Sequence, residues 1–233
     1  EFMARPCLRA CEDFAQAGYP DCEALLIVEV EGSEAEIDDQ LTRIKAIARR
    51  HDPLELREAR DADEAGRIWL GRKSAFGAMG QINDYMCLDG TIPVSALPQV
   101  LQRIGEMSRD YGLEVANVFH AGDGNLHPLI LFDANVPGEF ERTEAFGSRI
   151  LEMCVEVGGC ITGEHGVGVE KIRQMAVQFN DEELQQFHDV KAAFDPAGIL
   201  NPGKGVPALK FCQEYRSLEH KQHKHDTVDA AHG

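Results

Sequence analysis

The sequence predicts an α+β fold: an antiparallel sheet of the ferredoxin-like type, with helices on one face and a helical extension at the C-terminal end. Strand-like and helix-like segments are interleaved along the chain without a long run of parallel β-α units. Two apolar runs on either side of a turn-forming stretch predict a hairpin. The 233 residues, 43% of them hydrophobic, are enough for one domain with a sizeable core.

The first elements follow from hydrophobic spacing and from helix-capping signals. Residues 23–32 (EALLIVEVEG) are apolar and β-branched, which predicts a strand. Ser33 and Glu36 then form a capping-box pattern that begins a helix, and the apolar residues of this helix are spaced to pack one face on a sheet. A short strand is expected over 53–59, followed by a helix over 61–79 that opens with aspartates.

The second half of the chain supplies the hairpin and three more helices. A strand that starts near residue 83 is expected to end at Ile92, because a proline follows. An amphipathic helix over 94–112 closes on a glycine. The expected hairpin strands and the last two helices cover, in order, 114–120, 126–133, 138–157 and 181–194.

The domain organisation is simple. We expect one domain over residues 1–207, followed by a polar tail over 208–233 that is disordered. The opening residues 1–3 (EFM) resemble a cloning remnant in front of a fragment of a longer protein.

Composition excludes some classes of function. A net charge of -17 and a sequence pI near 4.9 argue against a nucleic-acid partner, which would require clustered Lys and Arg. The longest apolar runs are strand-sized, well short of the roughly 20 residues that span a bilayer. The 7 cysteines form no paired framework and no CxxC motif, which favours reduced thiols in a cytoplasmic protein over a disulfide scaffold or a cysteine metal site.

Residues 120–127 (HAGDGNLH) bracket a tight turn with two histidines. If residues 122–125 form the turn, His120 and His127 lie directly opposite each other, with β-carbons about 5 Å apart. Two imidazoles placed in this way can bind one metal ion. They can equally be ordinary polar residues at strand ends, because a histidine pair needs a third ligand to make a metal site.

A candidate third ligand lies in the glycine-rich stretch 158–168 (GGCITGEHGVG). Neighbours in an extended segment point to opposite sides, so Glu164 would complete the metal shell while His165 faces a substrate. Two histidines and one carboxylate with open positions suit a catalytic zinc or another divalent ion. A phosphate-binding loop is the alternative, but the stretch lacks the G-x-G-x-x-G order. Just after it, Lys171 and Arg173 are expected to be solvated helix charges rather than groups that neutralise a bound phosphate.

Three separated motifs, NVFHAGDGNLHPLILFD, GGCITGEHGVGVEKIRQM and FDPAGILNPGKG, occur in one order. Together they resemble the C-terminal domain of FAD-linked oxidases of the vanillyl-alcohol oxidase type. Two more segments, ARPCLRACEDFAQAGYP and GRKSAFGAMGQINDYMCLDGTIP, are most similar to the glycolate oxidase and D-2-hydroxyacid dehydrogenase branch of that family. The resemblance extends over nearly the whole chain up to residue 207.

The resemblance implies a substrate domain of a flavoprotein oxidoreductase that acts on a small 2-hydroxy acid. It also implies two cofactors. One is FAD, held mainly by an N-terminal domain that this sequence lacks, and the other is a divalent metal such as zinc, iron or manganese. Other glycolate oxidase subunits are implied as partners. The protein is expected to be cytoplasmic and to associate peripherally with the inner membrane through these subunits. Without the flavin domain, the chain is expected to be inactive.

The resemblance also implies roles for single residues. His120, His127 and Glu164 match the metal ligands of the family, and His165 matches its catalytic base. Asn125 would lie at the substrate, while Arg72 would pair with the substrate carboxylate through its two-pronged donor face. The segment expected to meet the flavin consists of Asn201, Pro202, Gly203 and Lys204.

The sequence departs from some relatives at two positions. A threonine and a lysine that hold dicarboxylate substrates align with Phe76 and Cys87, which favours a small 2-hydroxy acid such as glycolate or lactate. Two other classes of function remain open on the sequence alone. One is a stand-alone ferredoxin-like binding or assembly module with structural histidines, and the other is a metal-dependent hydrolase that uses an activated water.

Overall fold

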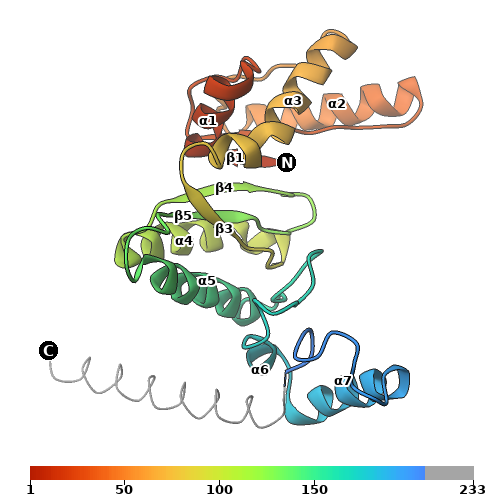
Figure 1. Ribbon diagram of the computed structural model, residues 1–233. Helices are drawn as coiled ribbons and strands as arrows, with labels where there is room; N and C mark the ends of the chain where they lie inside the picture. Colours follow the sequence, from red (N-terminus) through yellow and green to blue (C-terminus); the bar gives the residue numbers. More distant parts are fainter. Residues whose placement is uncertain (208–233) are drawn as a thin grey trace, which may run out of the picture.

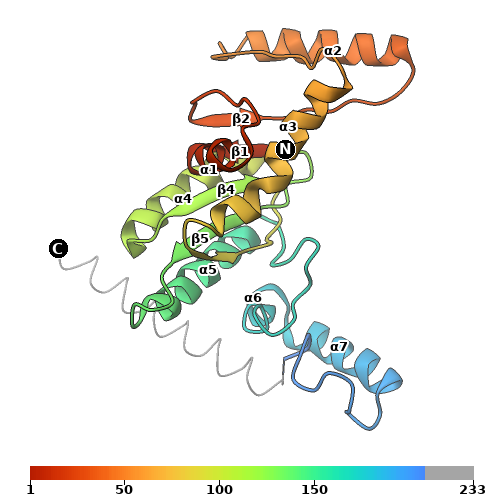
Figure 2. The ribbon, with the colours of Figure 1, turned by 45° about the horizontal axis from the view of Figure 1, so that its top comes forward.

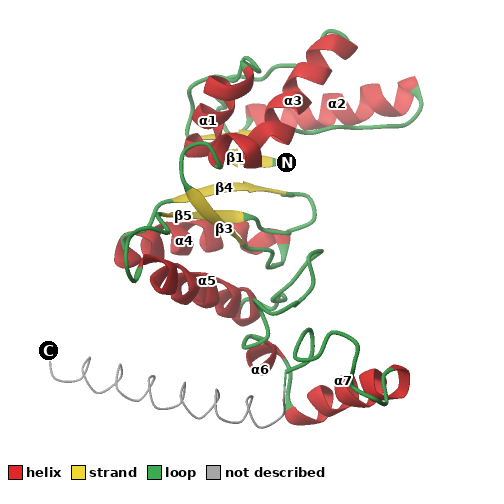
Figure 3. Cartoon of the chain, viewed as in Figure 1, coloured by secondary structure: helices red, strands yellow, loops and turns green. Residues whose placement is uncertain are grey.

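The computed structural model describes residues 1–207, and this part of the chain is built around a five-stranded sheet in the order β2-β1-β4-β5-β3 (Figures 1 and 3). Every pairing between these strands is antiparallel. The predicted α+β class is therefore confirmed. The strands are β1 Phe2–Ala4, β2 Ala24–Leu26, β3 Asp84–Cys87, β4 Val115–Phe119 and β5 Pro128–Phe132.

Helices cover both faces of the sheet, whereas the sequence suggested one. Helices α1 (Arg5–Ala15) and α3 (Ala62–Met79) lie on one side, and α4 (Leu97–Tyr111) and α5 (Glu139–Glu156) lie on the other (Figures 1 and 2). Each side has its own cluster of buried apolar residues. The reason lies in the two hairpin strands, which are apolar on both faces, so that each face requires a cover.

The first residues of the chain form part of the sheet. Strand β1 pairs with β2 on one side and with β4 on the other. Met3 is fully buried, and the ring of Phe2 stacks on that of Phe119 with centroids 4.7 Å apart. Residues 1–3, which were expected to be a cloning remnant, thus contribute to the packed sheet of the structure.

Helix α2 (Glu34–Arg49) begins as predicted but packs differently. The backbone N–H of Ser33 donates to the Glu36 carboxylate over 2.8 Å, as a capping box requires. None of the helix residues is buried, however, and the helix lies apart from the sheet in Figure 2. The expectation that it packs on the sheet is wrong.

The two strands predicted around α2 are mostly irregular in the structure. Strand β2 is confined to Ala24–Leu26 and lies at the edge of the sheet, and residues 53–59 form no strand. A strand needs a hydrogen-bonding partner, and the predicted segment 53–59 pairs with no other strand in the described residues.

The C-terminal extension comprises α6 (Met175–Gln178) and α7 (Asp181–Phe194), which lie beyond α5 (Figure 1). Asn180 caps α7 by accepting from the backbone N–H of Glu183.

A short 3-10 turn, Val94–Ala96, precedes α4. Within residues 1–207, no helix is both long and apolar enough to cross a membrane. The predicted tail over 208–233 lies outside the described residues.

Candidate metal and substrate site

The two motif histidines lie at the end of β4 and the start of β5. His120 bridges to Asn125 around a turn of residues 121–124, and Asn117 lies opposite Pro128. This register places His127 opposite Val118, so the prediction that the two histidines are directly opposed is wrong. They are diagonal neighbours on the same face of the sheet, and their rings lie 5.2 Å apart.

The carboxylate of Glu164 lies among three imidazoles. Its Oε1 atom is 3.0 Å from Nε2 of His127 and 3.7 Å from Nε2 of both His120 and His165. The rings of His127 and His165 are stacked, with centroids 5.1 Å apart. The fold thus brings together four residues that are separated into two motifs in the sequence.

The hydrogen bonds of this cluster show that its atoms fit a cation. Nδ1–H of His120 donates to Glu1, and Nδ1–H of His127 donates to the carbonyl of Leu88. A neutral imidazole that donates through Nδ1 presents a lone pair at Nε2. In this neutral form, both lone pairs face the Glu164 carboxylate, which is itself an acceptor. Two histidines and one carboxylate form a donor set that zinc and similar metals bind. The ligand atoms that lie within 4.8 Å of one another belong to Asp89, His127, Glu164 and His165, and His120 lies outside this group.

A buried aspartate holds the loop that carries Glu164 and His165. Asp89, which is 0% exposed, accepts the backbone N–H groups of Gly163, Glu164 and His165 over 3.1, 3.0 and 2.9 Å. Because three successive N–H groups converge on one carboxylate, the loop is curled. The prediction of an extended segment with Glu164 and His165 on opposite sides is therefore wrong, and both side chains reach the same cluster.

Lys171 neutralises this aspartate. Its Nζ lies 2.8 Å from Asp89 Oδ2 and 3.1 Å from the hydroxyl of Thr162, which also donates to Asp89. Burial acts to raise the pKa of Asp89, but these partners and the loop N–H groups hold it well below its usual range. The expectation that Lys171 is a solvated charge is wrong, because its side chain is buried.

Sequence reasoning missed Asp89 as a site residue. A ligand atom of Asp89 lies within 4.8 Å of those of His127, Glu164 and His165. Its oxygens are already occupied by five donors, so its contribution is to position the loop. The sequence did contain a signal. Asp89 lies inside an otherwise mostly apolar run, MCLDGTI, whereas an aspartate in a solvent-exposed turn would have more polar neighbours.

Asn125 and a glycine meet at the same place. A β-carbon on Gly163 would lie 2.6 Å from Asn125 Oδ1, so only a glycine allows the loop to approach this side chain. Asn125 is buried, and its Oδ1 accepts no hydrogen bond from the described part of the chain. An unsatisfied buried amide oxygen beside the cluster suits a hydroxyl donor from a ligand.

Arg72 approaches the cluster from α3. Its Nε and Nη2 atoms lie 3.0 and 2.9 Å from Oε2 of Glu1, whose other oxygen accepts from Nδ1 of His120 over 2.9 Å. Burial acts to raise the pKa of Glu1, but the charge of Arg72 and the bond from His120 lower it overall. The predicted pairing of Arg72 with a substrate carboxylate stays a prediction.

Phe76 and Cys87 occupy the two positions at which the sequence departs from relatives that bind dicarboxylates. Phe76 meets the ring of His127 edge-on, with centroids 6.3 Å apart. Cys87 ends strand β3, and burial, together with the nearby charge of Asp89, raises the pKa of its thiol to about 12. The thiol therefore stays neutral at physiological pH.

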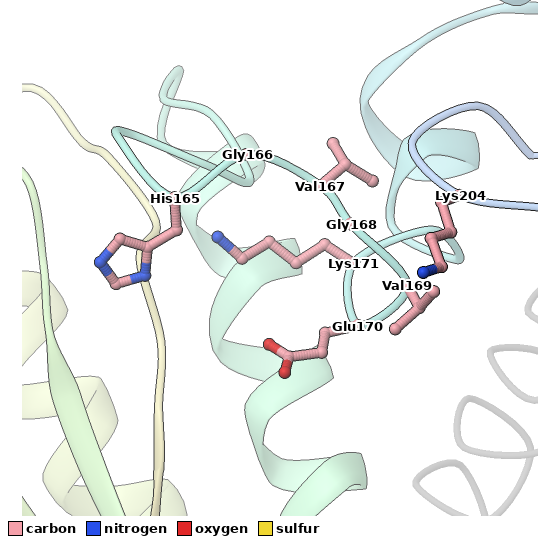
Figure 4. Close-up of a pocket in the computed structure, with 8 residues that line it drawn as sticks. All are labelled: His165, Gly166, Val167, Gly168, Val169, Glu170, Lys171 and Lys204. Atoms are coloured by element: carbon pink, nitrogen blue, oxygen red, sulfur yellow. The ribbon is translucent and has the colours of Figure 1, made fainter. Parts of the chain in front are cut away.

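The residue that follows the segment Asn201–Lys204 contacts the glycine-rich loop, because Gly205 N–H donates to Gly168 O over 2.8 Å. Lys204 lines a cavity of about 350 Å³ together with residues 165–171. Figure 4 shows the Lys171 side chain reaching toward the part of the loop that carries His165, with Lys204 at the other end of the cavity. Of the predicted flavin-contacting residues, Lys204 is the one that lines this cavity.

Comparison with protein families gives a match along the described chain. The family described as "FAD linked oxidases, C-terminal domain" matches residues 1–205. Because the match starts at residue 1, it supports the native character of strand β1.

Individual relatives agree with this match. The protein named glycolate oxidase subunit GlcD from Escherichia coli is 55% identical over 227 residues, which are 97% of this chain and 45% of that protein. Its namesake from Bacillus subtilis is 35% identical over 88% of this chain and 44% of the relative. A mitochondrial D-lactate dehydrogenase (cytochrome) from Arabidopsis thaliana is 30% identical over 78% of this chain and 33% of that protein. The chain thus spans less than half the length of these relatives.

A solved structure shares the fold. The 4-ethylphenol oxidase from Gulosibacter chungangensis, in its isoeugenol complex, superposes with a TM-score of 0.57 at 16% sequence identity. The superposition covers 88% of this chain and 47% of the oxidase chain.

Proposed function

The chain belongs to the family of FAD-linked oxidase C-terminal domains, and from this premise we propose that it is the substrate- and metal-binding domain of a flavin-dependent 2-hydroxyacid oxidoreductase. The named relatives are a glycolate oxidase subunit and a D-lactate dehydrogenase, whose names both refer to small 2-hydroxy acids. One observation carries the proposal: the Glu164 carboxylate lies within 3.7 Å of three imidazole Nε2 atoms.

His120, His127 and Glu164 are the proposed metal ligands. Two histidines and one carboxylate leave coordination positions open, which is the arrangement of catalytic rather than structural sites. When bound, the metal would act as a Lewis acid that lowers the pKa of the substrate hydroxyl. Zinc, iron and manganese all suit this donor set.

His165 is the proposed general base. Its ring is half exposed, lies against His127 and reaches the same carboxylate, so a hydroxyl held at the open coordination positions would be within its range. Asn125 would lie at the bound substrate, because its buried side chain sits directly beside the loop that carries Glu164 and His165. The overall oxidation removes the hydroxyl proton to His165 and the α-hydrogen as hydride, and FAD supplies the acceptor for the hydride.

The surroundings of the histidines support a small substrate. Phe76 lies against His127, and Cys87 is neutral, so neither residue offers a charge to a second carboxylate. This favours glycolate or lactate over a dicarboxylate. Arg72 is the nearby cation proposed to attract the single carboxylate of such a substrate, and in the structure its Nε and Nη2 atoms are both directed at Glu1, which leaves Nη1 for that role.

FAD would be held mainly by an N-terminal flavin domain, since the chain corresponds to 45% of the Escherichia coli relative. The segment Asn201–Lys204 and the cavity beside it are proposed to face that domain. Further subunits and a peripheral position at the inner membrane are proposed on the same basis, by analogy with glycolate oxidase subunits.

Calorimetric titration with Zn²⁺ tests the metal site. We expect one ion to bind to the 233-residue chain and this binding to disappear in the His120→Ala, His127→Ala double variant. Both proteins keep the histidines of residues 208–233, so any adventitious binding there cancels in the comparison. Equal binding by the two proteins would contradict the proposed site.

A further inference from the structure

Glu1 lies next to the metal-site candidate because of the sheet register. Phe2 lies opposite Phe119 and Met3 opposite Val118, so Glu1 comes opposite His120. Side chains opposite each other in an antiparallel pair point to the same face. Glu1 and His120 therefore share the face that α1 and α3 cover.

Glu1 is held in place on several sides. Its backbone exchanges two hydrogen bonds with Ile27, of 2.9 and 3.0 Å. Two nitrogens of Arg72 donate to Oε2, which leaves Oε1 directed at Nδ1 of His120. The side chains of Glu1 and Arg72 are 14% and 8% exposed, so water competes little for these bonds.

From this arrangement we propose that Glu1 is the positioning residue of His120, with Arg72 as the clamp that holds Glu1. A carboxylate can only accept, so it requires a proton on Nδ1 of His120 and leaves the Nε2 lone pair facing Glu164. The carbonyl of Leu88 does the same for His127. Outer partners of this kind orient metal-binding histidines and raise their basicity.

The inference rests on the proposed function in one respect only: the effect of Glu1 on metal affinity requires the proposed metal site, whereas its effect on the tautomer of His120 does not. The tautomer of His120 is a property of the chain without metal, and the affinity for metal is a separate readout. Measuring both distinguishes failure of this inference from failure of the proposed function.

The test compares Glu1→Ala with Glu23→Ala in the 233-residue chain. Glu23 also pairs with an arginine, with its carboxylate 2.9 Å from Arg5, but it contacts none of the site histidines. Nitrogen-15 NMR of the imidazoles at a pH where they are neutral reports the tautomer. We expect the proton of His120 on Nδ1 in wild type and in Glu23→Ala, and a shift toward the Nε2–H form in Glu1→Ala.

Zn²⁺ titration provides the second readout. We expect the affinity to fall about 10- to 100-fold in Glu1→Ala and to stay unchanged in Glu23→Ala, with Glu1→Gln in between because its amide oxygen still accepts. An unchanged tautomer in Glu1→Ala, with the variant folded by thermal melting, would overturn the inference. If wild type binds no Zn²⁺, the proposed metal site fails while the tautomer still decides the role of Glu1.

Discussion

At the scale of single residues, the loop that carries Glu164 and His165 depends on one carboxylate. Asp89 is completely buried, and its partners come from the loop backbone, Thr162 and Lys171. A buried charge is tolerated only when it is paired and hydrogen-bonded, and here both conditions are met within one short loop. The geometry of the candidate site therefore depends on the ion pair between Asp89 and Lys171, although neither residue is a proposed metal ligand.

Replacement of Asp89 should expose this dependence. We expect Asp89→Asn to reduce the free energy of unfolding by about 3–5 kcal/mol, because Lys171 would remain buried without a counter-charge. The Asp89→Asn, Lys171→Met double variant should lose less than the sum of the two single variants. Urea denaturation measures all three free energies. Asp21→Asn, which removes solvent-accessible pairs with Arg9 and Arg5, should change stability by no more than about 1 kcal/mol.

The same pair predicts a dependence on acid pH. The pKa of Asp89 is lower in the folded chain than in the unfolded chain, where it is about 3.9. Its stabilisation is therefore fully present above about pH 5 and is lost progressively as the pH falls through about 4 toward the folded pKa. The difference in unfolding free energy between wild type and Asp89→Asn should narrow from pH 7 to pH 3, and a constant difference would contradict the assignment.

At the scale of elements, the hairpin turn controls how the two strands present their histidines. The turn contains two glycines with different surroundings. Gly124 has a φ of +71°, and a β-carbon there would lie 2.1 Å from the carbonyl oxygen of Ile92. Gly122 has no neighbouring atom within 4 Å of such a β-carbon.

These two glycines form a matched pair for mutation. We expect Gly124→Ala to lose at least about 1–3 kcal/mol of stability, because the substitution combines an unfavourable backbone conformation with a clash against main chain. Gly122→Ala should stay within about 0.5 kcal/mol of wild type. Thermal or urea unfolding measures both, and equal effects would mean that the turn differs from the one described.

At the scale of the whole molecule, the chain corresponds to less than half of its relatives. The proposed chemistry divides between proton transfer, which this chain would perform, and hydride acceptance, which requires the flavin. The family match, to a domain described as FAD linked, favours the proposed oxidoreductase over a stand-alone assembly module or a hydrolase.

This division predicts the behaviour of the isolated chain. With glycolate or D-lactate, added FAD and an artificial electron acceptor, we expect no dye reduction above the level of a His165→Ala variant. A relative that carries its own flavin domain serves as the positive control. Turnover by the isolated chain that disappears in His165→Ala would show that the flavin domain is dispensable.

The sequence by itself determined the features that depend on neighbouring residues. The capping box of α2, the hairpin near residues 121–124 and the adjacency of Glu164 to His165 all involve residues a few positions apart. The site residues suggested by family resemblance are close together in the fold, although their roles stay predictions. The register of the hairpin was missed by two residues, since turn composition indicates a turn without fixing which residue starts it.

Only the tertiary structure decided which distant residues meet. Arg72 and Glu1 are 71 positions apart, and Lys171 and Asp89 are 82 apart, yet each pair forms a buried ionic contact. Periodicity and capping carry no information about such pairs, because they describe one element at a time. The contacts arise when both faces of the central strands are covered and side chains from separate elements are buried together, where each charge requires a partner.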